Sequence, residues 1–465
     1  MPEAVGGERP QVLKVLEPAT ETVLEEIPRA GADDVDAAVE RARAAYPAWR
    51  ALSPSDRAAL LRAVSDAVRE HREDLAQIEA RNAGKPIGDA RGKMDMVAQV
   101  FGYYAGAPER LLGDSIPVSG GQAWTVREPL GVVGLIVPWN FPLTIAAWKL
   151  GPALAAGNTV VLKPAELTPL SAVRFAEIAR EAGLPEGVLN VVVGPGATCG
   201  QRLVAHPDVA KIAFTGSTEV GRAIAAGAAQ TIKRVTLELG GKSPNIVFAD
   251  ADLAAAAAAA PGAVFGNAGQ DCCARSRILV QRPALDVFMS ALEGAVSALR
   301  VGDPLDASTE MGPLISASHR SAVASFVDEG APVAFRGTAP DGPGFWFAPT
   351  VLCPVDPGAR AAREEIFGPV AVVIPFDDEE EAIRLANDTI YGLSGSIWSR
   401  DGGRALRVAR ALDAGVLSIN SNTSVRVSTP FGGFEQSGYG RELGPHALDA
   451  YTEVKSIFFS TASAG

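Results

Sequence analysis

The chain has few of the side chains that bind metals or form disulfides. Its 465 residues include only four cysteines and four histidines. Cys272 and Cys273 are adjacent, which suits no ordinary bridge, and Cys199 and Cys353 lie far from them. The cysteines are too few and too scattered for a disulfide framework. We predict neither disulfides nor a metal site.

The chain also has fewer basic than acidic residues, 42 lysines and arginines against 54 aspartates and glutamates. The formal net charge is -12 and the calculated pI is about 5.0. This balance argues against nucleic acid or an anionic membrane as a main partner. The first residues, MPEAVGGERPQVLKV, show no basic segment followed by an apolar core. We therefore expect no secretory signal and a cytoplasmic location.

Uninterrupted hydrophobic runs of membrane-spanning length are missing. The nearest candidate, LGVVGLIVPWNFPLTIAAW at 130–148, is broken by Pro138, Asn140 and Pro142. Proline disrupts helical hydrogen bonding, so the stretch predicts a buried strand, a sharp turn and the start of a helix.

The usual G-x-G-x-x-G dinucleotide fingerprint is absent as well. Instead, FTGSTEVGR places Gly216 and Ser217 between an apolar run and a helical pattern. Backbone N–H groups at a helix start suit a pyrophosphate. Many strand-to-helix turns carry Gly-Ser without binding anything, so this motif alone leaves both interpretations open.

What is present is regular alternation of short apolar runs and helical stretches. The first hundred residues are rich in helix formers, and from Trp124 strands such as VVGLIVP, TVVLKP and KIAFTGS alternate with helices. A second series follows Gly241. The pattern predicts an α/β fold with two doubly wound parallel sheets, and in the first series it predicts ligands at the carboxyl ends of the strands. The length favours at least two domains.

Three stretches carry possible catalytic groups. Cys272 or Cys273 in GQDCCARSR could be a nucleophile, although most free cysteines are structural. Glu238 ends an apolar strand in VTLELGGKSPN, where burial would raise its pKa toward that of a useful base. Asn140, in a turn bracketed by prolines, could donate to an oxyanion.

Other polar residues have both a binding and a surface interpretation. Lys163 and Glu166 follow a strand and could hold ribose hydroxyls, or form a solvated pair. Of Glu364 and Glu365 in REEIFGPV, we expect one to face a ligand and the other to face solvent.

Taken together, these stretches resemble the aldehyde dehydrogenase superfamily over nearly the whole chain. The motifs that carry the resemblance, in the order of the family, are PWNFPL, GNTVVLKPAELTP, FTGSTEVGR, LELGGKSPNIVF, GQDCCARSR, EEIFGPV and PFGGFEQSGYGRELG. The resemblance implies a Rossmann-like NAD-binding domain at 1–111 and 130–240 and a catalytic domain at 241–436. It also implies a small β oligomerisation element at 112–129 and 437–465, and hence a homodimer or homotetramer.

The resemblance also assigns catalytic roles. Cys272 is the expected nucleophile, attacking an aldehyde to form a thiohemiacetal and then a thioester. Asn140 and the backbone N–H of Cys272 would hold the oxyanion. Glu238 would activate the water that hydrolyses the thioester to a carboxylic acid, and its presence argues against the CoA-acylating branch.

The same resemblance implies the ligands of NAD. Lys163 and Glu166 would hold the adenosine ribose, while Gly216 and Ser217 would lie by the pyrophosphate. Glu365 would hold the nicotinamide ribose. The carboxylate of Glu166 would repel a 2′-phosphate, which favours NAD while leaving NADP possible. Phe367 would pack near the nicotinamide and Trp139 along the cleft, although Trp139 could equally be structural.

The substrate itself is not named by the sequence. Expected lining residues are Phe141, Trp148, Asp271, Cys273, Arg426 and Phe431. Asp271 would favour a cationic aldehyde and Arg426 an anionic one, and both could instead face solvent. Asp271, Arg275 and Glu435 depart from the commonest family pattern, Arg275 standing where glycine is frequent.

Two rival functions remain at this point. A thiol esterase or hydrolase could use Cys272, Asn140 and Glu238 without a cofactor. A non-catalytic family member would be expected to lack Cys272 or Glu238, and both are present.

Overall fold

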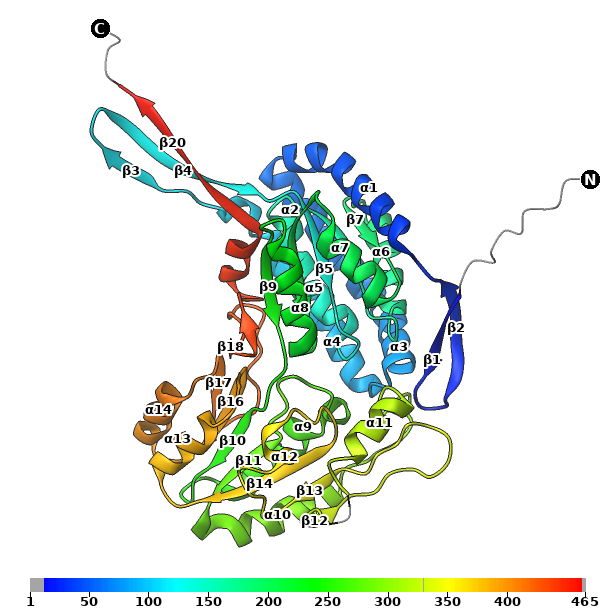
Figure 1. Ribbon diagram of the computed structural model, residues 1–465, viewed down its shortest axis with the longest axis vertical. Coiled ribbons are helices and arrows are strands. Elements are labelled where there is room, and N and C mark those ends of the chain that lie inside the picture. Colours follow the sequence, from blue (N-terminus) through cyan, green and yellow to red (C-terminus); the bar gives the residue numbers. More distant parts are fainter. Residues whose placement is uncertain (1–11, 329, 462–465) are drawn as a thin grey trace, which may run out of the picture.

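The computed structural model describes residues 12–328 and 330–461. The outer ends of the predicted domain ranges, 1–11 and 462–465, lie outside it, as does most of the stretch inspected for a signal. The described chain forms two lobes and an arm that projects from the upper lobe (Figure 1).

The upper lobe is built on a six-stranded sheet with the order β19-β9-β8-β5-β6-β7. Its strands are β5 (Val132–Ile136), β6 (Thr159–Lys163), β7 (Leu189–Val191), β8 (Val209–Thr215), β9 (Arg234–Glu238) and β19 (Gly438–Tyr439). All pairings are parallel except that of β19 with β9. From β5 the chain moves to β6 and β7 on one side, then to β8 and β9 on the other. The sheet is therefore doubly wound, and its order reverses between β5 and β8.

Helices surround this sheet, some packed directly on its strands and others on neighbouring helices, and many of their buried apolar residues join its core. They are α1 (Ala32–Ala51), α2 (Pro54–Glu70), α3 (Arg72–Ala83), α4 (Ile87–Ala105), α5 (Pro142–Ala155), α6 (Leu170–Glu181), α7 (Gln201–Ala205) and α8 (Thr218–Ala229). The Ser53 hydroxyl caps α2 by accepting from the Asp56 N–H, and α3 ends at Gly84 in a left-handed conformation. The stretch 130–148 forms β5, a turn and the start of α5, as predicted.

The lower lobe contains a seven-stranded sheet with the order β12-β13-β14-β11-β10-β16-β17. Its strands are β10 (Pro244–Val247), β11 (Arg277–Gln281), β12 (Val333–Arg336), β13 (Thr350–Leu352), β14 (Val370–Phe376), β16 (Ser394–Trp398) and β17 (Val416–Ile419). Only β12 is antiparallel to its neighbour. Its helices are α9 (Leu253–Val264), α10 (Leu285–Ser297), α11 (Ala317–Ala324), α12 (Arg360–Arg363), α13 (Glu379–Asn387) and α14 (Gly402–Ala411). The alanine-rich stretch is α9, a packed helix. The expected pair of doubly wound sheets is confirmed.

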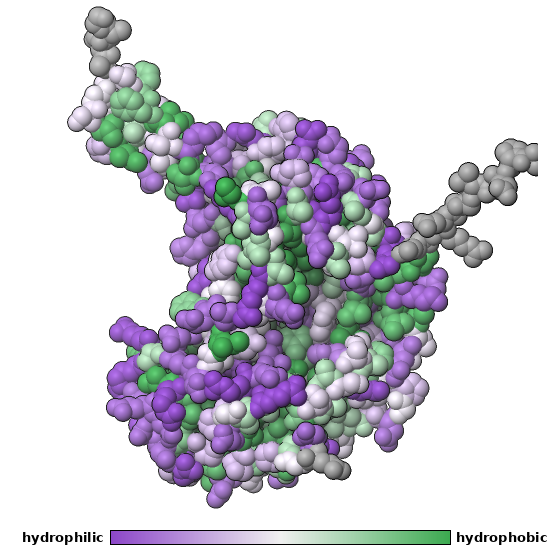
Figure 2. Space-filling model, viewed as in Figure 1, coloured by the Kyte–Doolittle hydropathy of each residue, from purple (hydrophilic) through white to green (hydrophobic). Residues whose placement is uncertain are grey.

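The arm is a three-stranded sheet, β20-β4-β3, of β3 (Ser115–Val118), β4 (Gly121–Pro129) and β20 (Thr452–Ser460). Apolar side chains gather on its surface (Figure 2), among them the exposed Ile116, Val454, Phe458 and Phe459. The sequence grouped all of 437–465 with this element, but β19 instead extends the six-stranded sheet. Two small two-stranded sheets complete the fold, one of β1 (Val12–Glu17) with β2 (Thr22–Pro28), the other of β15 (Tyr391–Gly392) with β18 (Phe434–Glu435). In the described residues, the search for a helix both long and apolar enough to cross a membrane finds none.

Candidate active site

Two cavities meet at Cys272. The first, here called the Glu365 cavity, has a volume of about 250 Å³ and is lined by Asn140, Ser217 and Glu365 among others. The second, the Glu238 cavity, has a volume of about 270 Å³ and lies on the other side of the cysteine. Cys272 and Thr215 line both. A thiol in this position can reach a molecule in either cavity.

Turns at the carboxyl ends of strands in the six-stranded sheet form part of the wall of the Glu365 cavity. Trp139 and Asn140 follow β5, and Gly216 and Ser217 follow β8, so the cavity lies at the point where the strand order reverses. The Ser217 hydroxyl caps α8 by accepting from the Val220 N–H at 3.4 Å. The N-terminus of α8 thus opens at the cavity, with the polarity that favours an anion.

Glu365 reaches the same cavity from the lower lobe. Its Oε1 accepts from the Gly241 N–H at 2.8 Å, and burial raises the pKa of this carboxyl to about 7. A Cβ on Gly240 would lie 2.4 Å from Glu365 Oε2, so glycine is needed there for the close approach. Glu364 is exposed and pairs with Arg360 at 2.9 Å. Glu365 thus faces a cavity and Glu364 faces solvent, while contact of Glu365 with a ligand stays a prediction.

An aromatic group forms one wall of the Glu365 cavity. The rings of Trp139 and Phe367 meet edge to face, with centroids 5.3 Å apart. The His319 ring lies 5.3 Å from Trp139, and its Nε2 is 2.8 Å from the Phe367 carbonyl oxygen. Burial lowers the pKa of His319, which keeps the ring neutral near pH 7. No motif around His319 indicated this position.

The loop before Cys272 is held in an unusual backbone conformation. Asn267, Ala268 and Gly269 all have positive φ, between 52° and 70°. The Lys85 ammonium secures the turn by donating to the Asn140 carbonyl and to Asn267 Oδ1, both at 3.0 Å. The Asn140 amide in turn donates to the Gln270 carbonyl at 2.9 Å. This contact places the Asn140 side chain beside the cysteine loop and leaves its second N–H for another acceptor.

Lys85 and Asn267 were missed by the sequence reasoning. Lys85 is fully buried and its ammonium also lies 4.0 Å from the centroid of the Phe141 ring. The two residues are 182 positions apart, so only the folded chain shows that they form one contact. Gln270 had a visible signal, because it precedes the cysteine pair. Its Oε1 accepts from the Ile315 N–H at 2.9 Å.

The environment of Cys272 favours the protonated thiol. The neighbouring Cys273 thiol is the largest cause, followed by burial and by the charges of Asp271 and Glu365, and together they raise the pKa of Cys272 well above its usual value. The three side chains of Asp271, Cys272 and Cys273 bring their ligand atoms within 4.8 Å of one another. Asp271 Oδ1 accepts from the Cys273 N–H at 2.8 Å. Nucleophilic attack therefore needs a base to take the thiol proton.

Glu238 is positioned in the second cavity to be such a base. It is the last residue of β9, is 4% exposed, and neither carboxyl oxygen has a hydrogen-bond partner. Burial, and then the carboxylate of Glu442, raise the pKa of Glu238 well above its usual value. The positive charge of Lys149 opposes this rise in the pKa of Glu238. The Lys149 ammonium is 2.5 Å from Glu442 Oε1. Two unpartnered oxygens facing a cavity can accept a proton or bind a water.

The remaining predicted positions divide between the cavities and other places. Phe141, Trp148, Asp271, Cys273 and Phe431 line the Glu238 cavity. Arg426 is exposed, donates to the carbonyl of Val425 at 2.9 Å, and is not among the lining residues. Lys163 is buried at the end of β6 and Glu166 is half-buried, and neither lines the Glu365 cavity. Their cofactor contacts and the role of Arg426 stay predictions.

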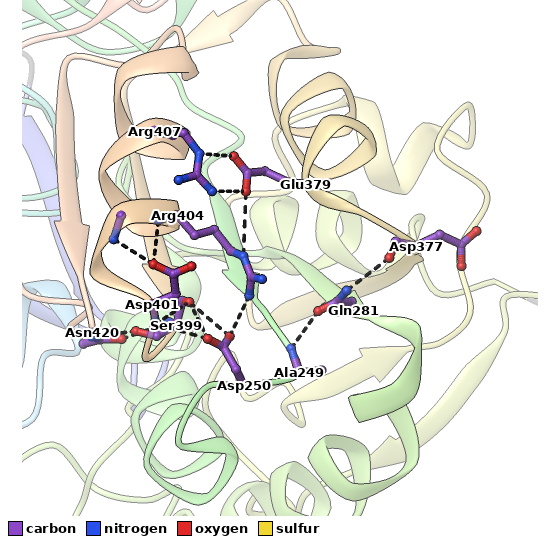
Figure 3. Close-up of polar contacts among 11 residues, drawn as sticks. Ala249, Asp250, Gln281, Asp377, Glu379, Ser399, Asp401, Arg404, Arg407 and Asn420 are labelled. Atoms are coloured by element: carbon purple, nitrogen blue, oxygen red, sulfur yellow. Dashed lines mark hydrogen bonds and ion pairs between the residues drawn. The ribbon is translucent and has the colours of Figure 1, made fainter.

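The carboxyl edge of the seven-stranded sheet is filled by its own side chains (Figure 3). Asp250, after β10, accepts from the Ser399 hydroxyl and from Arg404, each at 3.0 Å. Glu379 binds Arg407 through two hydrogen bonds of 2.8 and 2.9 Å. Asp401 caps α14 by accepting from two N–H groups. These groups therefore satisfy one another across this edge.

Comparisons with known proteins agree with this geometry. A profile of the aldehyde dehydrogenase family matches residues 5–457. Betaine aldehyde dehydrogenase of Bacillus subtilis is 42% identical over 99% of this chain and 97% of its own length. The NADP/NAD-dependent aldehyde dehydrogenase PuuC of Escherichia coli is 44% identical over 97% of this chain and 92% of its own. The crystal structure of betaine aldehyde dehydrogenase from Staphylococcus aureus in complex with NAD⁺ superposes with a TM-score of 0.95 at 40% identity, covering 97% of this chain and 92% of that one.

Proposed function

The chain belongs to the aldehyde dehydrogenase family and is an NAD(P)-dependent aldehyde dehydrogenase, and on that premise we propose that it oxidises its aldehyde through Cys272 as nucleophile and Glu238 as base. The observation that carries the proposal is the place of Cys272, on the wall shared by the two cavities. An aldehyde in the Glu238 cavity and a cofactor in the Glu365 cavity would both adjoin its sulfur. We assign the catalytic domain to 241–436 and the cofactor domain to 1–111 with 130–240.

The first step is addition of the thiol to the aldehyde. Because the pKa of Cys272 is raised, its proton must leave as the sulfur attacks the carbonyl carbon. An ionised Glu238 takes that proton directly or through a water. The free N–H of the Asn140 amide and the backbone N–H of Cys272 stabilise the oxyanion of the thiohemiacetal.

The second half of the reaction is hydrolysis. The chemistry that the dinucleotide supplies when bound is acceptance of a hydride, which leaves a thioester on Cys272. Glu238 then removes a proton from a water as the water attacks the thioester carbonyl, releasing the carboxylic acid and the thiol. The two unpartnered oxygens of Glu238 provide the acceptors that this water needs.

The Glu365 cavity fits a dinucleotide. The N-terminus of α8 suits a pyrophosphate, the buried carboxylate of Glu365 suits ribose hydroxyls, and the Trp139–Phe367 wall suits an aromatic ring. Lys163 and Glu166, at the end of the adjacent strand β6, would hold the adenosine ribose. The carboxylate of Glu166 favours NAD over NADP because it repels a 2′-phosphate.

The test is NADH formation at 340 nm across neutral, amino and carboxy aldehydes, with NAD and with NADP. We expect turnover with NAD, and expect Cys272→Ser to lower kcat by at least about 10⁴-fold. The matched variant Cys273→Ser should keep kcat within a few-fold. A folded enzyme that hydrolyses esters without NAD and oxidises no aldehyde would support the rival thiol esterase. Equal loss in both serine variants would contradict the assignment of the nucleophile.

We further propose that the arm joins copies of the chain into a homodimer or homotetramer. Phe458 and Phe459 are 57% and 60% exposed on β20, an edge strand that a partner sheet could cover. Sedimentation equilibrium of wild type and Phe458→Glu should show an oligomer and a smaller species, respectively. A monomeric wild type would contradict this proposal.

A further inference from the structure

Arg275 is a buried cation on the wall of the Glu238 cavity. It lies three residues after Cys272, is 2% exposed and lines this cavity. A guanidinium that is removed from water is costly unless a negative charge accompanies it. A buried Arg275 therefore needs a negatively charged partner.

Every acceptor recorded for Arg275 is neutral. Its Nε donates to Ser396 Oγ at 2.9 Å, and its Nη1 donates to Ser394 Oγ at 2.7 Å and to the Cys273 carbonyl. Its Nη2 donates to Ser424 Oγ at 2.9 Å. Within residues 12–328 and 330–461, Arg275 forms no ion pair with a carboxylate.

One donor of Arg275 remains unused. A guanidinium has five N–H groups, and the four contacts above leave one N–H on Nη2. Ser424, the partner of that nitrogen, also lines the cavity. Its hydroxyl accepts from Arg275 and can donate its own proton to an anion. The pair therefore places a cation and a hydroxyl side by side on the wall of this cavity.

The other charged groups of the cavity do not cancel this corner. The Asp271 carboxylate is held by the Cys273 N–H beside the two thiols, at the reacting end. Lys93 is a second cation on the wall, and its ammonium is 3.6 Å from Asp89. Burial, and then the charge of Glu442, raise the pKa of Glu238, so both disfavour a negative charge on its carboxyl.

We infer that Arg275, together with Ser424, selects aldehydes that carry a carboxylate at the end remote from the carbonyl, that is, semialdehydes of dicarboxylic acids. The carboxylate supplies the missing counter-charge when the aldehyde carbon is at Cys272. This inference rests on the proposed function and names its substrate class. It replaces Arg426, which faces solvent, as the source of anion selectivity.

The experiment compares kcat/KM for matched aldehydes with NAD. The pairs are butanal with succinic semialdehyde and hexanal with adipic semialdehyde, and 4-trimethylammoniobutanal is the cationic member. Wild type should prefer the carboxylated member of at least one pair by about 10- to 100-fold, the range for a hydrogen bond to a charged group. No preference at either length overturns the inference, while turnover of the neutral aldehydes would show that the proposed function still holds. Failure with every aldehyde would instead remove the proposed function.

Variants then locate the selectivity. Arg275→Met, of similar volume, should abolish the preference while changing kcat/KM for the neutral aldehydes only a few-fold. Arg275→Lys should keep a preference with KM for the semialdehyde raised about 10-fold, because lysine lacks the forked donors. If the methionine variant fails to fold, the lysine variant provides the test. Its KM should rise for the semialdehyde and stay unchanged for the neutral aldehyde of the same length. The surface control Arg426→Met should match wild type. A preference that survives in Arg275→Met, or an equal loss for both members of each pair, overturns the inference.

Discussion

The two parallel sheets of this protein present opposite ends to the same cysteine. The six-stranded sheet contributes the turns that follow β5 and β8 and the last residue of β9, all at its carboxyl edge. The seven-stranded sheet contributes Cys272 and Glu365, which precede β11 and β14 at its amino edge. The cavity walls at Cys272 therefore come from the carboxyl edge of the first sheet and from the amino edge of the second.

The difference comes from what occupies each edge. In the six-stranded sheet, short turns with Gly216 and Asn140 leave backbone and side-chain donors facing a cavity. In the seven-stranded sheet, Asp250, Ser399 and Arg404 close the corresponding edge among themselves. A doubly wound topology thus offers a crevice, and the side chains at the strand ends decide whether a ligand can use it.

The largest expected effect comes from Glu238, the carboxyl-edge group closest to the chemistry. Glu238→Gln keeps the shape but cannot take a proton, so steady-state kcat should fall by about 10²–10⁴-fold. Because Glu238 is also proposed to take the proton of Cys272, stopped-flow mixing should show no fast burst of NADH in this variant. A burst about equal to the active sites, followed by slow turnover, would contradict that first role and restrict Glu238 to hydrolysis. Cys273→Ser, with burst and turnover preserved, is the control.

Glu365 tests the amino-edge contribution. Burial raises its pKa to about 7, so the carboxyl is protonated below that pH and ionised above it. The ionised carboxylate is the stronger hydrogen-bond acceptor for ribose hydroxyls, so KM for NAD should rise as the pH falls below about 7. Glu365→Gln should raise KM for NAD by about 10- to 100-fold and remove this pH dependence.

The neighbouring Glu364 provides the control for that measurement. It is exposed and paired with Arg360, so Glu364→Gln should leave KM for NAD and its pH profile unchanged. Equal effects of the two substitutions would show that general surface charge, and not the position of Glu365 in the cavity, governs cofactor affinity.

The sequence was sufficient to predict several groups that line the cavities, but not the directions of their neighbours. Cys272, Glu238 and Asn140 each follow a short motif with a recognisable strand or turn, and all three line the cavities. Whether Asp271 and Arg426 face the substrate depends on rotamers and loop paths that no local pattern encodes. The structure turns Arg426 to solvent and leaves Asp271 beside the thiols.

Long-range contacts set the other limit. The burial of Arg275 depends on Ser394 and Ser396 of β16, more than a hundred residues later. The position of Asn140 depends on Lys85 and Asn267, which belong to different lobes. A polar residue in a turn looks like a surface residue until the elements that cover it are known.

The smallest effect on activity is expected at the closed carboxyl edge of the seven-stranded sheet. Asp250→Ala removes the acceptor for the Ser399 hydroxyl, the Asp401 N–H and Arg404. The free energy of unfolding should fall by about 1–2 kcal/mol, at the low end for a charged acceptor because Asp250 is partly exposed to water. The kcat and both KM values should stay within about two-fold, because this cluster lies at the edge opposite to Cys272. Thermal melts and the NADH assay measure the two quantities on the same preparation. If kcat falls in a variant that melts like wild type, the Asp250 cluster affects catalysis at the opposite edge. The two edges of the sheet would then differ in position but not in their importance for activity.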